Sequence, residues 1–187
     1  MVRAQLAEIY RTQPKSVCMY SKAVIEGLAS KGSLFIWHLK LESKILYDPR
    51  GFVGILYESV VPYSGYQKDI LVYEQIALDV ARSFEESSSL NGADLHALFV
   101  ALRNTCLLLT MSKGTPAFAR NSAGRVAHEL FPMLPHDRIA YEILSEEHLR
   151  YTRNASLSPK ALGNAKQRTL VEYVLAFVKE SRLQLPK

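Results

Sequence analysis

Hydrophobic residues recur every three or four positions along most of this chain, which is the spacing of amphipathic helices. Ser33 is suited to cap the N-terminus of a helix that ends before Asp48-Pro49. Gly32 is suited to end the helix that precedes Ser33. One short run, 16–21, has the residues of a strand. The pattern predicts helices over residues 2–12, 22–31, 34–47, 52–60, 66–86, 93–112, 117–131, 136–144 and 164–183. The expected fold class is mainly α, a helical bundle preceded by a small α or α/β element.

The segment 62–66, PYSGY, is the clearest break in this pattern, because Pro and Gly interrupt regular elements. We therefore expect two domains, residues 1–61 and 62–187. Residues 113–187 contain 12 basic and 7 acidic side chains, whereas residues 63–112 contain 3 and 6. A basic C-terminal part is typical of proteins that bind phosphate-bearing partners, and an ordinary solvated surface is the alternative.

The composition is that of an ordinary globular protein, with 187 residues of which 48% are hydrophobic and 22% charged. The chain has no run of about eighteen apolar residues and no apolar leader at its N-terminus, so we expect no membrane span and a cytoplasmic location. Cys18 and Cys106 lie among apolar neighbours, which predicts reduced core residues rather than a disulfide or a metal pair.

The stretch 98–123 begins in a helix that is apolar on almost every side and yet contains Arg103 and Asn104. The apolar positions of this helix are Leu95, Leu98, Phe99, Leu102, Cys106, Leu107, Leu108, Leu109 and Met111. Such a helix is normally buried, and a buried guanidinium needs a partner. The structural hypothesis pairs Arg103 with an acid of the preceding segment, for which the candidates are Glu74, Asp79 and Asp94.

The functional hypothesis makes the same stretch a binding site. Lys113 and Arg120 lie on either side of Gly114, and with Arg103 they would form a cluster that faces a phosphate. The planar fork of arginine fits a phosphate, and glycine lets the backbone approach it closely. The candidate binding residues for phosphate or nucleic acid are therefore Arg103, Asn104, Lys113 and Arg120.

Two stretches resemble parts of known bacterial proteins. Residues 16–53, from SVCMYS to DPRGFV, are similar to the end of a minimal nucleotidyltransferase domain, where a strand and a helix lead into a segment of the form gLF..HLk.Eg.iLyD..G. Residues 102–123, LRNTCLLLTMSKGTPAFARNSA, resemble the helical domain attached to such enzymes, which is similar to the HEPN group of helical bundles. The likeness covers about residues 10–130. It implies a nucleotidyltransferase-like remnant followed by a HEPN-like bundle.

The chain lacks the carboxylates that nucleotidyl transfer requires. The reaction needs two or three of them to converge on Mg²⁺, and the family places an Asp-x-Asp pair after a Gly-Ser turn and a third acid on a later strand. Here no such pair follows Gly32-Ser33, the run 16–19 has no acid, and Glu42 and Asp48 are isolated. We expect no nucleotidyl transfer by this chain alone, no metal site and no cofactor.

The HEPN ribonucleases imply a second chemistry. They use an Arg, often followed by Asn, and a His four to six residues later, to stabilise phosphate charge and to move a proton. Arg103-Asn104 is followed by no such His, and His96 lies seven residues upstream, where a surface or packing role is expected. The nuclease motif is not intact, and no catalytic residue is assigned.

The other histidines show no metal-ligand spacing. His38 precedes Glu42 by four residues, which predicts a hydrogen-bonded structural pair, and His136 and His148 are expected near helix starts or loops. The tyrosines near the break are expected to line a helix junction, with base stacking as the alternative; they are Tyr57, Tyr63, Tyr66 and Tyr73.

Three functions from different classes follow. The favoured one is a non-catalytic interaction module, related to nucleotidyltransferase and HEPN systems, that binds a protein partner or a second copy of itself to supply the missing half. It predicts an exposed apolar surface around Leu34, Ile36 and Trp37. The second is a nucleotide- or nucleic-acid-binding protein that uses the basic C-terminal surface. The third is a degenerate HEPN-type ribonuclease.

Overall fold

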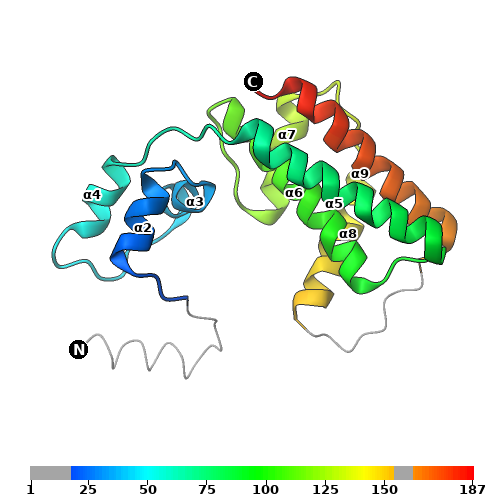
Figure 1. The fold of residues 1–187 in the computed structure, drawn as a ribbon, viewed down its shortest axis with the longest axis horizontal. Helices are drawn as coiled ribbons and strands as arrows, with labels where there is room; N and C mark the ends of the chain where they lie inside the picture. The colour runs from blue at the N-terminus through cyan, green and yellow to red at the C-terminus, as the bar shows by residue number, and fades with distance from the viewer. Residues whose placement is uncertain (1–17, 154–161) are drawn as a thin grey trace. The chain divides into compact units, whose positions relative to one another are not determined.

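The computed structural model (Figure 1) describes residues 18–153 and 162–187, and within these ranges it contains helices and no strand. The helices are α2 (Lys22–Ala29), α3 (Leu34–Glu42), α4 (Phe52–Glu58), α5 (Tyr66–Ser87), α6 (Gly92–Ser112), α7 (Arg120–Leu130), α8 (Arg138–Thr152) and α9 (Asn164–Gln184). The mainly helical fold is confirmed. The chain divides into two compact units, Met1–Ser64 and Gly65–Lys187. The division falls after Ser64, whereas the sequence pattern placed it after residue 61.

The first unit contains α2, α3 and α4 around a small core. The Ser33 side chain caps α3 as expected by accepting a hydrogen bond from the Phe35 amide. Gly32 ends the preceding turn with a φ of 64°, and a Cβ there would lie 2.6 Å from the Pro62 carbonyl oxygen. Both the backbone conformation and this close approach therefore require glycine. The buried core residues are Ala29, Ile36, Leu56 and Val60.

The second unit is a bundle built around α6, which packs against α5, α7, α8 and α9. In Figure 1, α5 and α9 run side by side along the bundle, in agreement with their direct packing. Asn91 and Asp94 begin α6 with a reciprocal capping box, which satisfies orphan amides of the first turn. The predicted apolar face is buried: Leu95, Leu98, Phe99, Leu102, Cys106 and Leu109 are each at most 3% exposed.

Helix α6 is, among the described residues, the one helix long and apolar enough to cross a bilayer. In the structure 61% of its most apolar window is buried. Helices on four sides account for that burial, because the central helix of a bundle is apolar around most of its circumference.

Several sequence predictions are corrected by the structure. Cys18–Ser21, the described part of the predicted strand 16–21, is not a strand, and the predicted helix 2–12 lies outside the described residues. Helix α3 ends at Glu42 rather than before Asp48: Ser43 is already extended, and the Asp48 carboxylate accepts hydrogen bonds from the first amides of α4. Helix α8 extends to Thr152, beyond the predicted end at 144. Cys106 is buried as expected, whereas Cys18 is exposed.

Candidate anion-binding site

The polar pair on α6 marks a gap in the packing around that helix. Over residues 101–110, Arg103 and Asn104 are the two residues that are not buried. Every other position in that run contacts neighbouring helices of the bundle closely enough to be covered. The sequence therefore places a guanidinium and an amide at the one opening along this part of the central helix.

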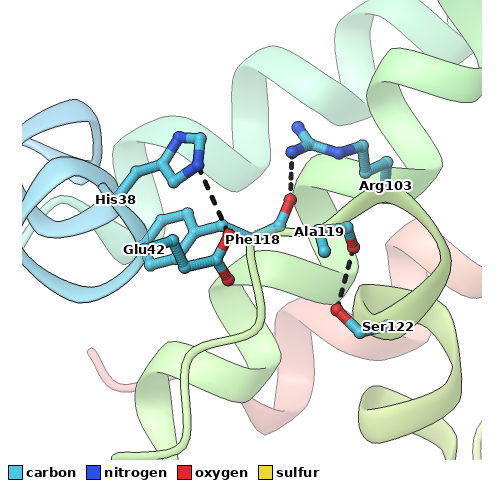
Figure 2. A network of polar contacts seen from close by, with 6 residues as sticks. All are labelled: His38, Glu42, Arg103, Phe118, Ala119 and Ser122. Atoms are coloured by element: carbon cyan, nitrogen blue, oxygen red, sulfur yellow. Dashed lines mark hydrogen bonds and ion pairs between the residues drawn. The ribbon is translucent and has the colours of Figure 1, made fainter. Parts of the chain in front are cut away.

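Hydrogen bonds hold Arg103, and no ion pair to it occurs among the residues that the structure describes. Its Nη2 donates to the Phe118 carbonyl oxygen, and its Nη1 donates to Asn104 Oδ1 over 3.1 Å. Figure 2 shows the first of these bonds, together with the bond from the Ser122 hydroxyl to the Ala119 carbonyl at the start of α7. Burial and the charge of Asp69 raise the pKa of the nearby Tyr73 hydroxyl of α5, and Asn104 and Arg103 act in the opposite direction. These contacts fix the guanidinium while leaving part of its donor set open.

The predicted acid partner of Arg103 is wrong. Glu74 pairs with Arg182 over 3.0 Å, Asp79 lies 3.6 Å from Arg82, and Asp94 belongs to the α6 cap. Each of these carboxylates therefore interacts with a group other than Arg103. A backbone carbonyl satisfies the guanidinium without cancelling its charge, so Arg103 keeps a full positive charge at the opening.

Gly114 reverses the chain after α6 and brings the following residues back to that opening. It has a φ of 71°, its amide donates to the Met111 carbonyl, and the Thr115 amide donates to the Thr110 carbonyl. This is the Schellman arrangement, which favours glycine. The Ala117 amide then donates to Thr110 Oγ1, and this bond holds the segment after the turn against the end of α6.

Arg120, the first residue of α7, is positioned by α8. The Tyr141 hydroxyl donates to the Arg120 carbonyl oxygen over 2.6 Å. The Tyr141 ring lies so close to Gly124 that a Cβ on that glycine would be 2.6 Å from a ring carbon. A glycine at this position of α7 therefore makes room for the Tyr141 ring of α8.

A cavity of about 330 Å³ lies at this opening. Its lining contains two arginines, an amide and a histidine, and no carboxylate; the residues are Phe99, Val100, Arg103, Asn104, Arg120 and His148. Three of the four predicted binding residues thus meet at one place. Lys113 does not: its Nζ lies 5.1 Å from the centroid of the Phe131 ring, and it does not line this cavity.

His148 is the site residue that the sequence did not reveal. It lies inside α8, not near a helix start as expected, and its ring stacks on His96 of α6 with centroids 4.7 Å apart. The Nδ1 atoms of the two rings are 2.9 Å apart. The placement of His96 on the Arg103 side of α6 was visible in the sequence, but nothing there linked it to a residue 52 positions away.

The electrostatic field of this site is positive. Burial lowers the pKa of His148, and His96, Arg120 and Arg103 lower it further. The same positive neighbours would stabilise an anion placed among them. The arrangement can therefore hold a phosphate or a similar oxyanion by hydrogen bonds from two guanidiniums and an imidazole.

Most other arginines of the basic C-terminal part are neutralised by nearby acids. Arg125 pairs with Glu129, Arg138 with Glu142, and Arg150 with Glu147. None of the ion pairs found among the described residues involves Arg103 or Arg120. Arg120 is thus one of the basic residues of the stretch 113–187 whose charge no neighbouring acid offsets in an ion pair within the described residues.

The isolated acids of the first unit have structural roles. Asp48 accepts hydrogen bonds from the Phe52 and Val53 amides, and Glu42 lies 3.4 Å from the His38 ring as expected. No group of three or more potential metal ligands occurs in the part of the chain that the structure describes. Burial raises the pKa of the Cys106 thiol to about 12, which keeps it protonated and unreactive.

The chain matches no known family model, and no curated protein and no solved structure is significantly similar to it.

Proposed function

We propose that the helical unit Gly65–Lys187 binds the phosphate group of a nucleotide or of RNA. One observation carries this proposal: Arg103, Arg120 and His148 line one cavity that contains no carboxylate. Isolated like charges are costly to hold together, and an anionic ligand removes that cost.

The donors at this cavity suit an oxyanion. Arginine presents several N–H donors in one plane and binds phosphate oxygens in pairs, and it keeps its charge when it is partly buried. Asn104 orients the Arg103 guanidinium, so less conformational entropy is lost when a ligand binds. The function is binding; no catalytic step is assigned to this chain.

A titration of the full chain tests the proposal. Inorganic phosphate, nucleoside monophosphates and a short oligoribonucleotide are each titrated by calorimetry at low salt. We expect Arg120→Gln to weaken the binding of whichever of these ligands binds by at least about tenfold, which is 1.4 kcal/mol. Arg82→Ala, which removes an exposed arginine of α5, is the matched control and should leave binding unchanged. Equal affinities for the wild type and Arg120→Gln would overturn the proposal.

A second candidate function, binding of another protein chain, is favoured by the surface of the first unit. Its buried core is small, whereas large apolar side chains are exposed, with Leu46 72% and Ile55 67% accessible. Ile36 is buried within this unit and the Trp37 indole N–H donates to the Val61 carbonyl, so the exposed surface is not centred on them as expected. The exposed large apolar residues of the first unit include Leu41, Ile45, Leu46, Tyr47 and Ile55.

Site-specific photo-crosslinking tests this second function. A photoreactive residue at Leu46, in the full chain and in its native cells, should form a defined adduct with a second copy or with another protein. The same probe at exposed Glu85 of α5 is the control. Adducts that do not differ between the two positions would contradict the proposal.

A further inference from the structure

A second cavity, of about 730 Å³, lies between α7 and α8 and adjoins the first one. Arg120 lines both, so a ligand held by this residue can extend from one cavity into the other. The second cavity is within the size range of sites that enclose small organic molecules.

The two cavities differ in charge. The first contains Arg103 and Arg120 and no acid. In the second, Arg125 is paired with Glu129 and Arg138 with Glu142, both over 2.7 Å. Glu146 adds a further carboxylate there and balances Arg120. The second cavity is therefore neutral overall and offers hydrogen-bond donors and acceptors in similar numbers.

Flat rings also line the second cavity. His128 and His136 stack with centroids 3.7 Å apart and an angle of 11° between their planes. The Tyr141 ring forms another part of the wall, next to Gly124. Aromatic walls combined with a few polar groups are typical of sites for heteroaromatic rings.

We propose that the two cavities together hold one mononucleotide, with its phosphate at Arg103 and Arg120 and its base and ribose between α7 and α8. This inference rests on the proposed function and specifies the ligand. Carboxylates such as Glu146 accept hydrogen bonds from the amino groups of bases and from ribose hydroxyls. An RNA strand is disfavoured, because its next phosphate would lie beside Glu129, Glu142 or Glu146.

Calorimetry with the full chain and a series of ligands tests this inference. The series consists of inorganic phosphate, the nucleoside monophosphates, the corresponding nucleosides and a hexaribonucleotide. We expect at least one nucleoside monophosphate to bind at least about tenfold more tightly than phosphate. The hexaribonucleotide should bind no more tightly than that monophosphate, and the nucleoside should bind more weakly than it.

Two substitutions separate the base cavity from the phosphate cavity. Glu146→Gln removes the unpaired carboxylate, and Leu149→Trp fills the space between α7 and α8. Both should reduce the affinity for the monophosphate toward that of phosphate without weakening the binding of phosphate itself. Glu85→Gln on α5 is the matched control. Substitutions with no effect on the monophosphate would overturn the assignment of this cavity.

The outcomes distinguish the two proposals. If phosphate and all monophosphates bind equally, the mononucleotide inference is wrong and phosphate binding stands. If the hexaribonucleotide binds much more tightly than any monophosphate, the inference is also wrong and the ligand is RNA. If none of the ligands binds, both proposals are wrong.

Discussion

The Nδ1 atoms of His96 and His148 lie 2.9 Å apart in nearly parallel rings, with an interplanar angle of 6°. One ring must donate and the other accept, so the pair shares one proton between these two atoms. A second proton there would place two cations in contact, beside Arg103 and Arg120. The pair is therefore the part of the site most sensitive to pH and to bound anions.

We expect the ligand-free chain to lose stability as the pH falls below about 6.5, the ordinary histidine pKa. The folded state lowers the pKa of His148 by burial and by its cationic neighbours, and burial and His128 lower that of His136. Below about pH 6.5 the unfolded chain therefore binds protons before the folded chain does, and the free energy of unfolding decreases. Urea unfolding at several values between about pH 7 and 5.5, above the range where carboxylates titrate, measures this slope.

A variant identifies the contribution of the His pair to that slope. His148→Gln should make the pH dependence of the unfolding free energy less steep than in the wild type. Identical slopes in the wild type and His148→Gln would show that the pair is not responsible.

We expect phosphate to raise the pKa of His148. An anion between Arg103 and Arg120 offsets their charges and favours the imidazolium form. By linkage, the affinity for sulfate, an oxyanion whose charge does not change in this range, should then increase as the pH falls through the titration range of the histidine. NMR titration of the His148 ring resonances, with and without phosphate, measures the shift. A pKa that phosphate leaves unchanged would place the anion elsewhere.

Arg103 and Arg120 should differ in their effects on stability. Arg103→Ala removes the hydrogen bond from the guanidinium to the Phe118 carbonyl oxygen. We expect this loss to lower the free energy of unfolding by about 1–2 kcal/mol. Arg120→Ala removes no hydrogen bond that its side chain makes within the described part of the chain and should cost less than about 0.5 kcal/mol. Both should weaken phosphate binding. Urea unfolding and calorimetry on both variants decide this, and equal stability losses would contradict the different roles of the two residues.

Gly124→Ala should be destabilising although it adds a good helix former to α7. The new Cβ would lie 2.6 Å from the Tyr141 ring, and such overpacking costs about 1–3 kcal/mol. Gly54→Ala in α4 is the matched control, because nothing lies within 4 Å of its Cβ and it should stabilise the chain by about 0.5–1 kcal/mol.

The consequence of Gly124→Ala for binding follows from the same geometry. Displacement of Tyr141 would release its bond to the Arg120 carbonyl, so phosphate affinity should also decrease. Thermal unfolding and calorimetry measure both effects. A Gly124→Ala variant as stable as the wild type would show that the Tyr141 ring lies farther from α7 than described.

The sequence by itself indicated the helices of the second unit, although it placed the end of α8 too early. The periodicity of apolar residues indicated the helix that became α6, because this signal depends on neighbours within a few residues. It also marked Arg103 and Asn104 as out of place in an apolar helix. Where local signals competed, as between Asp48 as the end of one helix and as the cap of the next, the pattern was misread.

Only the tertiary structure decided which side chains meet. His148 joins Arg103 because α8 packs on α6, and Arg103 is satisfied by the Phe118 carbonyl and not by an acid because the Gly114 turn brings the chain back over α6. Spacing along one helix cannot reveal such contacts, since they depend on how separate helices pack. Backbone carbonyls, moreover, are present at every residue and leave no trace in a sequence pattern. The sequence thus showed an arginine at an unusual position in an apolar helix. The tertiary structure placed this arginine in a positively charged cavity with residues of α7 and α8.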